Sequence, residues 1–210
     1  MRRKRKMKIG TIGAGNVGTA LTTASRRAGH DVTISSNDPA DAQKLAAEVG
    51  AQAARSNRED VAASDLVILA VPFDAVEAIV AQGGDLAGKV LIDVTNRFDP
   101  MQLTGESNAE RIQKMAPQAT VVKAFNTIFA AHQADPTAHG VQLDGFVAGE
   151  DGEAKAQVLE FVRTLGFRPI DASPLAMSRA LEGMGTLNIA LNMKNQWPWQ
   201  TGWKLLGPTG

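Results

Sequence analysis

The chain has 210 residues, with 22 acidic and 22 basic side chains and no cysteine. The absence of cysteine excludes disulfides, thiolate metal sites and a cysteine nucleophile, and it fits a cytoplasmic protein. Aromatic residues make up 5% of the chain and tyrosine is absent, which argues against the aromatic platforms that stack single-stranded nucleic acid.

Positive charge is concentrated near the start of the chain. Residues 2–6 hold five of the 22 basic side chains, so the rest of the chain has five more acidic than basic residues. This net negative charge on the rest of the chain does not attract a nucleic-acid backbone. We expect residues 1–7 to be a disordered, solvated head, although such a head could also contact anionic lipid or nucleic acid. No apolar segment indicates a secretory signal or a membrane span, so no membrane contact is expected.

Apolar runs typical of strands alternate with segments of helical periodicity along most of the chain. The strands are predicted at residues 8–12, 31–35, 51–54, 66–71, 90–94, 121–125, 146–148 and 168–171. The helices are predicted at residues 16–28, 38–49 and 154–165, and from about residues 57, 74, 107 and 173. This alternation predicts an α/β fold with a doubly wound parallel sheet of the Rossmann type. We expect residues 8–172 to form this dinucleotide-binding domain and residues 173–210 to form a small C-terminal helical extension with a tryptophan-rich tail.

Three helix starts carry capping signals. Asp38 stands before Pro39, and proline suits the first position of a helix because its missing N–H has no partner to lose there. Asp74 and Ser107 are each followed three residues later by a glutamate, which is the spacing of a capping box.

The last predicted helix carries an apolar stripe, formed by Met177, Leu181, Met184, Leu187 and Leu191. We expect the stripe to pack on the domain; a dimer interface or the mouth of a second pocket is the alternative. All three tryptophans follow it, Trp197, Trp199 and Trp203. Large rings gathered in one tail usually bury against something. They could cover the edge of this chain's own sheet or close a partner's pocket.

A G-x-G-x-x-G motif follows the first predicted strand and opens the first helix. It consists of Gly13, Ala14, Gly15, Asn16, Val17 and Gly18. In this strand–turn–helix context, Gly13 permits a tight turn, Gly15 lets the backbone approach a pyrophosphate, and Gly18 lets the helix pack closely. The N–H groups at the helix start would then bind the pyrophosphate of a dinucleotide.

The end of the second predicted strand favours NADP over NAD. NAD sites usually place a carboxylate there, on the ribose hydroxyls. This chain has Ser35, Ser36 and Asn37 instead, and these side chains can donate to a 2′-phosphate. Asp38 stands near the spacing of the carboxylate, but we expect it to cap the next helix. Arg55, at the end of the third predicted strand, could add positive charge.

Other turns at the carboxyl ends of strands should line the same crevice. The candidates are Val71, Pro72 and Phe73 after the fourth strand, Thr95 and Asn96 after the fifth, and Asn126 and Thr127 after the sixth. Each of these could bind the nicotinamide end of the dinucleotide or could be an ordinary turn.

The chain offers little conventional catalytic chemistry. His30, His132 and His139 have no ligand-like or carboxylate spacing around them, so neither a metal site nor a histidine base is predicted. Without tyrosine, a Tyr–Lys dehydrogenase pair is impossible. An enzyme of this composition would move hydride by holding two rings face to face, without a strong side-chain acid or base.

Six segments resemble the NADPH-dependent coenzyme F-420 reductase family, whose members act on a 5-deazaflavin. The segments are KIGTIGAGNVGTAL, GHDVTISS, LVILAVPFDAV, KVLIDVTN, VVKAFNTI and RPIDASPLAMSRALEGM, and the match runs over about residues 8–195. The resemblance implies a Rossmann domain with a small helical C-terminal part, and a homodimer. Ferric reductases and pyrroline-5-carboxylate reductases share the first half of the pattern.

The resemblance also implies positions for the bound dinucleotide. It implies that the pyrophosphate lies against Ala14, Gly15, Asn16 and Val17. It implies that the 2′-phosphate lies against Ser36 and Asn37, and the nicotinamide ribose along Val71 and Pro72.

The two reacting rings are implied to lie near Ala124 and Asn126. Two positions depart from the family's usual residues: Asn37 stands where an arginine is common, and Asn126 stands where a histidine is common.

The sequence therefore predicts an NADP(H)-dependent oxidoreductase that transfers hydride between nicotinamide and a deazaflavin (coenzyme F-420) or flavin. One alternative is an NADPH-dependent reductase of a small imine or carbonyl compound. Another is a non-enzymatic module that senses NADP(H). A second cleft beside the nicotinamide, lined by the last helix, would favour the enzyme over the sensor.

Overall fold

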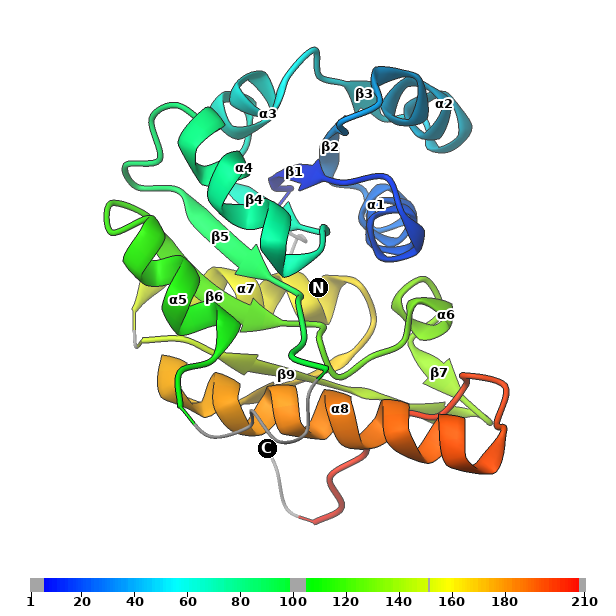
Figure 1. The fold of residues 1–210 in the computed structure, drawn as a ribbon. Coiled ribbons are helices and arrows are strands. Elements are labelled where there is room, and N and C mark those ends of the chain that lie inside the picture. Colours follow the sequence, from blue (N-terminus) through cyan, green and yellow to red (C-terminus); the bar gives the residue numbers. More distant parts are fainter. Residues whose placement is uncertain (1–5, 99–104, 151, 208–210) are drawn as a thin grey trace.

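An eight-stranded sheet runs through the molecule in the computed structural model, which describes residues 6–98, 105–150 and 152–207 (Figure 1). The strand order is β10-β9-β6-β5-β4-β1-β2-β3. The strands are β1 (Lys8–Ile12), β2 (Asp31–Ser35), β3 (Gln52–Ala53), β4 (Leu66–Leu69), β5 (Val90–Asp93), β6 (Thr120–Ala124), β9 (Asp144–Ala148) and β10 (Arg168–Asp171). The six strands from β1 to β6 are mutually parallel, so the predicted Rossmann-type fold is confirmed.

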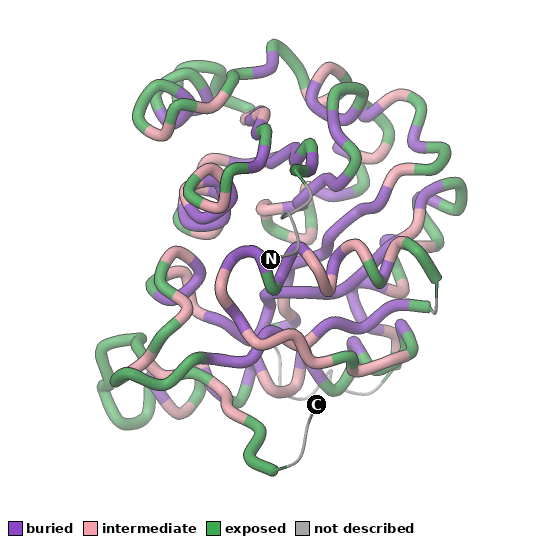
Figure 2. The backbone as a smooth tube through the Cα atoms, turned by 180° about the vertical axis from the view of Figure 1, so that it is seen from behind, coloured by how far each residue is buried: buried purple, intermediate pink, exposed green. Residues whose placement is uncertain are grey.

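Helices cover both faces of the sheet. The helices are α1 (Asn16–Arg27), α2 (Pro39–Val49), α3 (Asn57–Ala63), α4 (Val76–Gln82), α5 (Asn108–Met115), α6 (Ala130–Gln133), α7 (Glu153–Thr164) and α8 (Ser178–Asn195). One apolar core joins α1, α2 and α7 to the sheet, and a second joins α3, α4 and α5 to the opposite face. Figure 2 shows the consequence, with burial concentrated along the strands and on the inner sides of the helices.

The prediction of a wholly parallel sheet is wrong at one pair of strands, because β9 runs antiparallel to β6. The segment between them holds α6 and a small hairpin of β7 (Thr137–Ala138) and β8 (Val141–Gln142). For β9 to run parallel to β6, the chain would have to cross back to the amino ends of the strands, and this segment does not do so. The next unit, β9-α7-β10, is again parallel.

Two of the three predicted helix caps are confirmed. The Asp38 carboxylate accepts a hydrogen bond from the N–H of Ala40 at 2.9 Å. Ser107 and Glu110 form both halves of a capping box. The box expected at Asp74 is wrong: residues Phe73–Ala75 form a 3-10 turn ahead of α4, and among the described residues no side chain caps either element.

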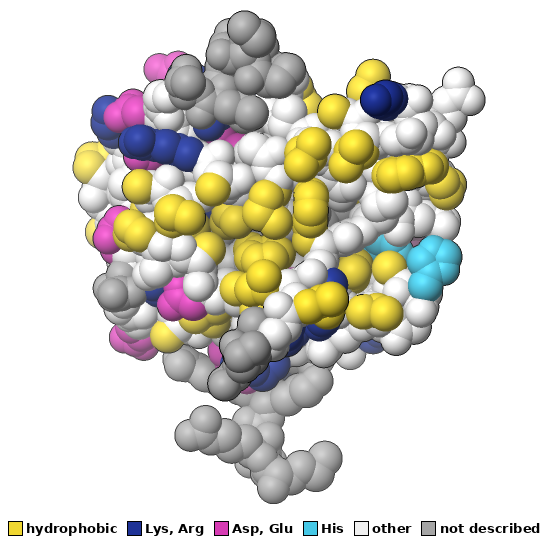
Figure 3. Space-filling view, turned by 90° about the horizontal axis from the view of Figure 1, so that it is seen from below, with side chains coloured by type: hydrophobic (Ala, Val, Ile, Leu, Met, Phe, Trp, Pro, Cys, Tyr) yellow, Lys and Arg dark blue, Asp and Glu magenta, His cyan; other side chains and the backbone are white. Residues whose placement is uncertain are grey.

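Helix α8 packs with a different face from the one predicted, and the two faces overlap at Leu181. Its buried residues are Ser178, Leu181, Glu182, Gly185, Thr186, Asn188 and Asn192, which are mostly small or polar. Leu181 is the one member of the predicted apolar stripe that is buried; Met177 and Leu187 are 42% and 51% exposed. Figure 3, which views the molecule from the α8 side, shows hydrophobic side chains gathered across this face. The reason is a buried polar cluster that holds the helix, described below.

The segment after α8 lies along the chain's own sheet. The Asp144 carboxylate, at the start of β9, accepts from the N–H of Leu205 at 2.6 Å and pairs with Lys204 and Arg168. The Trp199 ring meets Phe129 edge-on, with 5.4 Å between ring centroids, yet Trp199 stays 44% exposed. Within one chain the tail therefore contacts the starts of β9 and β10, while Trp197 and Trp199 stay exposed.

At the other end, the fold begins earlier than predicted. Met7 is buried in the core, and Lys6 pairs with Asp31 at 2.8 Å, so these two residues do not belong to a disordered head. Residues 1–5 lie outside the described residues. In the part of the chain that the structure describes, no helix combines the length and the apolar character needed to cross a membrane.

Candidate active site

The glycine motif forms the turn between β1 and α1, and each glycine has a different structural reason. Gly13 has φ +112°, and a Cβ there would stand 2.3 Å from the carbonyl oxygen of Ala70. A Cβ on Gly18 would stand 1.9 Å from the carbonyl oxygen of Gly13. A Cβ on Gly15 would meet no described atom within 4 Å outside its chain neighbours. Gly13 and Gly18 are therefore required by the fold, whereas Gly15 borders open space that a ligand could fill.

The start of α1 suits an anion in that space. The first turn, which includes Asn16 and Val17, has no acidic residue, and no described side chain caps the helix. Gly15 is the N-cap residue and is extended, with φ −75°. Free N–H groups and the positive end of the helix dipole therefore face the open side of the turn, as binding of a pyrophosphate requires. Ala14 lies in this turn, and its carbonyl accepts from the Thr19 hydroxyl.

At the end of β2, three neighbouring side chains have separate surroundings. The Ser35 hydroxyl is buried and donates to Asp60 at 3.0 Å, so it faces the protein and not a ligand. Ser36 is half-buried and Asn37 is exposed, which leaves both able to contact a phosphate. Asp38 is occupied as the cap of α2, as predicted from the sequence.

The position of Arg55 is compatible with a contact to a 2′-phosphate at the end of β2. It follows β3, the neighbour of β2, and its exposed guanidinium pairs with Glu59 at 3.0 Å. The pair raises the pKa of Arg55 and lowers that of Glu59 through the hydrogen bond between them. Arg55 would have to leave Glu59 to bind a phosphate directly.

Asp60 lies beneath this region as a buried carboxyl group. Burial raises its pKa to about 6, against the lowering effect of hydrogen bonds from Thr33, Ser35 and Ser64. With a pKa of about 6, this carboxyl group is mostly ionised at neutral pH and takes up its proton as the pH falls through 6.

The turn after β4 lies against the glycine turn. The Val71 side chain is 3.1 Å from where a Cβ of Gly13 would be. Pro72 is exposed, and the Phe73 ring lies under the guanidinium of Arg111, 5.9 Å from the guanidinium carbon. Val71 and Pro72 thus border the crevice where the strand order reverses, between β1 and β4.

The turns after β5 and β6 are joined by an asparagine pair. The Asn96 amide donates to the carbonyl of Asn126, and the Asn126 amide donates to the Asn96 side-chain oxygen, both at 2.8 Å. The Asn126 amide also donates to the carbonyl of Leu181 in α8 at 2.9 Å. Ala124 is fully buried just before this turn, and Phe125 has φ +61°.

A cavity of about 120 Å³ lies between the glycine turn and α8. Its lining includes Val17 of α1, Asn96, Asn126, and Gly185, Asn188 and Ile189 of α8. The structure thus brings together predicted residues from the first helix, the fifth strand and the sixth strand. The residues contributed by α6 and α8 were missed, because polar residues on a helix give no sequence signal that distinguishes a cavity wall from a solvated face.

A buried ionic cluster fastens α8 to this edge of the sheet. The Lys123 ammonium contacts Asp93 at 2.7 Å and Glu182 at 2.8 Å, and it donates to the carbonyl of Thr95 at 2.6 Å. The second oxygen of Glu182 pairs with Arg97 at 2.5 Å. All four charged side chains are buried, and their charges balance. This cluster was not predicted, although a lysine inside the apolar run VVKAF is a signal, since a buried ammonium needs acidic partners.

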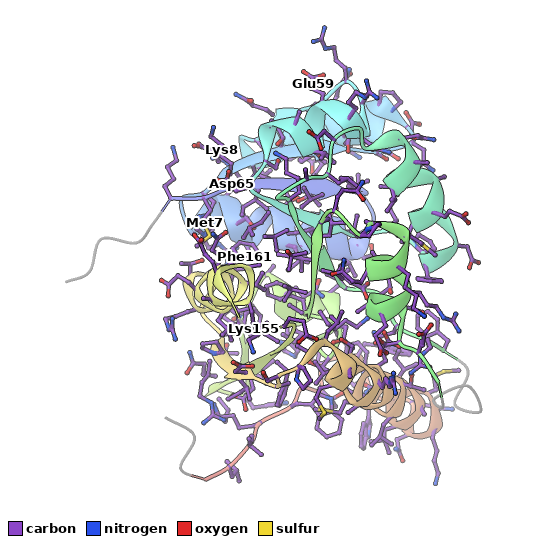
Figure 4. All side chains as sticks on the ribbon, turned by 90° about the vertical axis from the view of Figure 1, so that its left-hand side faces the viewer. Met7, Lys8, Glu59, Asp65, Lys155 and Phe161 are labelled. Atoms are coloured by element: carbon purple, nitrogen blue, oxygen red, sulfur yellow. The ribbon has the colours of Figure 1, made fainter. Side chains whose placement is uncertain are left out.

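A larger hollow lies elsewhere in the described part of the chain. It measures about 720 Å³ and is lined by the residues that precede parallel strands, among them Met7, Asp65 and Lys89. Figure 4 shows Met7, Lys8 and Asp65 together on that side of the molecule. Because ligands of open α/β sheets bind at the carboxyl ends of strands, we place the site at the smaller cavity.

Fold and site together define a Rossmann-type dinucleotide-binding protein, and comparisons with known proteins narrow this class. Residues 8–97 match the family of NADP oxidoreductases described as coenzyme F420-dependent. The F420-dependent NADP reductase of Methanocaldococcus jannaschii is 31% identical over 149 residues, which is 66% of either chain. A solved structure from Arthrobacter sp. FB24, provisionally described as an F420-dependent NADP reductase, superposes with a TM-score of 0.84 and 29% identity. That superposition covers 96% of this chain and 100% of the other. The chain belongs to this family of coenzyme F420-dependent NADP oxidoreductases.

The chain is also similar to proteins that are described by a different activity. The metalloreductase STEAP3 of Rattus norvegicus is 33% identical over 186 residues, which is 86% of this chain but 37% of the relative. The chain therefore spans little more than a third of the curated metalloreductases that it matches.

Proposed function

We propose that this protein is an NADP(H)-dependent oxidoreductase that transfers hydride between the nicotinamide ring and a deazaflavin or flavin ring. The observation that carries the proposal is the position of the cavity: it adjoins the glycine turn on one side and α8 on the other. A dinucleotide whose pyrophosphate lies at Gly15 would extend along the carboxyl ends of β4 and β5 toward this cavity. One of the two reacting rings would lie in this cavity, against the other ring at its mouth.

The chain's own groups bind and orient in this proposal. The N–H groups of Asn16 and Val17 hold the pyrophosphate, and Ser36 and Asn37 donate to the 2′-phosphate. Val71 and Pro72 form the wall along the ribose. The bound dinucleotide supplies the hydride chemistry, so the protein contributes alignment of two carbon atoms and exclusion of water.

The fixed wall of α8 supports this mechanism. Glu182 and Leu181 are bonded to Lys123 and Asn126, which belong to β6 and to the turn that follows it. A Cβ on Gly185 would stand 2.5 Å from the Asn96 side-chain oxygen, so the helix packs on the asparagine pair without room for a side chain. Rigid attachment keeps one wall of the cavity at a constant distance from the nicotinamide position, as alignment of two rings needs.

The test is a set of absorbance assays on the purified protein. NADPH and NADH would each be mixed with coenzyme F-420, with flavin mononucleotide, and with a cyclic imine. We expect oxidation of NADPH by F-420 or flavin. Oxidation only by the imine would support the alternative reductase, and tight binding of NADPH with no oxidation at all would support the sensor.

We also propose that two copies pair through the exposed apolar side of α8. Met177, just before α8, and Leu187 and Met193 of α8 are 42–66% exposed, and hydrophobic side chains gather on this face of the molecule (Figure 3). Single exposed apolar side chains are common on a surface, whereas a contiguous apolar patch marks an interaction site. A cytoplasmic location and the absence of a nucleic-acid or membrane partner remain predictions from the sequence.

A further inference from the structure

Four side chains around the 120 Å³ cavity each keep a buried polar atom without a partner among the described residues. The atoms are Oδ1 of Asn126, Oγ1 of Thr127, Oε1 of Gln133 and Nδ2 of Asn188. Each residue is at most 5% exposed. Buried polar groups in folded proteins nearly always have hydrogen-bond partners, so this concentration around one cavity requires an explanation.

In each of the three side-chain amides, the hydrogen bonds of the partnered atom show whether the unpartnered atom is the oxygen or the nitrogen. The Gln133 amide nitrogen donates to the carbonyls of Phe125 and Ile128, which leaves an oxygen facing no partner. The Asn126 amide nitrogen donates to the carbonyl of Leu181, which again leaves an oxygen.

Asn188 has the opposite arrangement. Its side-chain oxygen accepts from the Thr201 hydroxyl at 2.6 Å and from the Asn192 amide at 3.2 Å, so the unpartnered atom is the nitrogen donor. The residues that line the cavity therefore hold two unpartnered acceptors, one unpartnered donor, and one hydroxyl that can serve as either.

Thr127 is the most adaptable of the four. All four unpartnered atoms are covered by neighbouring groups, so each contacts a ligand in the cavity only after its side chain moves. The Thr127 hydroxyl has no partner, so rotation of the side chain toward a ligand breaks no bond. The cavity itself is smaller than the roughly 300–1,000 Å³ of sites that enclose a whole drug-sized ligand, so it suits a single ring or part of one.

We propose that Thr127, with Asn126, Gln133 and Asn188, recognises the amide edge of a ring, that is, a carbonyl beside an N–H. The Thr127 hydroxyl and the Asn188 amide would donate to the carbonyl, and the oxygens of Gln133 and Asn126 would accept from the N–H. The proposal rests on the proposed function, because both rings of that reaction carry such an edge: the carboxamide of nicotinamide and the pyrimidine ring of a flavin or deazaflavin.

The variant Thr127→Val tests this recognition, because it removes one hydroxyl and keeps the shape of the side chain. Binding would be measured by calorimetry for NADP⁺, for 2′-phospho-ADP-ribose, which lacks nicotinamide, and for flavin mononucleotide and coenzyme F-420. We expect the ligand whose amide edge enters the cavity to bind about 5- to 10-fold more weakly, the loss of one hydrogen bond. Affinity for 2′-phospho-ADP-ribose should not change.

Thr22→Val is the matched control. Thr22 is also fully buried with an unpartnered hydroxyl, but it lies within α1 and away from the cavity lining. Neither variant removes an existing hydrogen bond, so both should unfold at the same denaturant concentration as the wild type or a higher one. A merely structural role for Thr127 would instead lower stability and leave every affinity unchanged.

The outcomes separate the sources of the amide edge. Weaker binding of NADP⁺ alone would identify nicotinamide, and weaker binding of flavin or F-420 alone would identify the second ring. Unchanged affinity for all four ligands, or an equal change in Thr22→Val, would overturn the proposal. If the wild type transfers no hydride but Thr127→Val still weakens NADP⁺, the proposed function fails and the recognition stands.

Discussion

At the scale of single residues, the glycine motif separates a requirement of the fold from a requirement of the ligand. Gly18 leaves no room for a Cβ, whereas Gly15 faces open space with a φ that any residue can adopt. This distinction supports a clean experiment on the binding of the dinucleotide.

Gly15→Val should abolish dinucleotide binding while the protein stays folded, because the added side chain occupies the space of the pyrophosphate. The measurement is calorimetric titration with NADPH, accompanied by circular dichroism. Gly18→Ala is the contrasting variant, since its Cβ would overlap the carbonyl of Gly13 and lower stability. Unchanged affinity for NADPH in a folded Gly15→Val protein would show that the pyrophosphate lies elsewhere.

Ser36→Asp should weaken NADPH by roughly 10-fold or more, because a carboxylate beside a phosphate costs on the order of 1–3 kcal/mol. NADH has no 2′-phosphate and should bind equally well or better. The comparison of the two dissociation constants is the measurement. Equal weakening of both would mean that Ser36 does not face the 2′ position.

Asp60 gives stability a dependence on pH. Its pKa is raised to about 6 by burial, above the ordinary value of 3.8, so the unfolded chain loses its proton first as pH rises. This carboxyl group therefore lowers the free energy of unfolding progressively between about pH 4 and pH 6, and by a constant amount above pH 6.

Asp60→Asn should remove that penalty and raise the free energy of unfolding above pH 6 by about 1–3 kcal/mol. Urea denaturation at pH 4 and pH 8 measures the effect, which should be small at pH 4. Asp74→Asn, at an exposed position, is the control. An equal change at both pH values would contradict the assignment.

At the scale of elements, the sequence pattern predicted strands and helix starts correctly where one physical signal dominated. The buried runs at β4 and β5 and the capping box at Ser107 are observed where they were predicted, with strand ends moved by one or two residues. The final residues of three predicted strands, Val71, Val94 and Phe125, lie instead in the turns at the carboxyl edge. Periodicity cannot locate those ends, because an apolar residue suits a turn that lines a site as well as a strand.

Helix α8 shows where pattern fails. Its leucines and methionines predicted a buried stripe, but the ionic partners of Glu182 come from residues some 60 to 90 positions earlier in the chain. Long-range polar pairing decided which face is buried, and no local pattern in α8 contains that information. The direction of β9 was missed for a related reason, since it depends on the path of an irregular connection.

Glu182→Gln should destabilise the protein by about 3 kcal/mol, because it leaves the buried cations Lys123 and Arg97 short of a counter-charge. Denaturant unfolding measures the loss. Arg179→Ala, which breaks a partly exposed pair between Arg179 of α8 and Glu110 of α5, should have a much smaller effect. A similar effect for the two variants would mean that the cluster does not hold the helix.

At the scale of the whole molecule, the reversal at β9 divides the sheet into two parts with different tasks. The parallel strands from β1 to β6 form the site for the dinucleotide. The chain that follows contributes α6 and α8, which complete the cavity at the same edge.

The double variant Leu187→Glu and Met193→Glu should convert a dimer to a monomer, because it places two carboxylates on the exposed apolar side of α8. Light scattering measures the mass, and NADPH titration should show unchanged affinity. Gln157→Glu, on α7, is the control for added charge. A wild-type protein that is already monomeric at micromolar concentration would contradict the proposed pairing.

The attachment of α8 also has a consequence for how the protein is made. Glu182 meets Lys123, which lies 59 positions earlier in the chain, and Asn188 reaches the cavity only when α8 lies in place. During synthesis the strands from β1 to β6 leave the ribosome before α8. A chain released before α8 is made would lack one wall of the cavity and one acidic partner of Lys123. Under the proposed function, such a chain could not transfer hydride to a second ring.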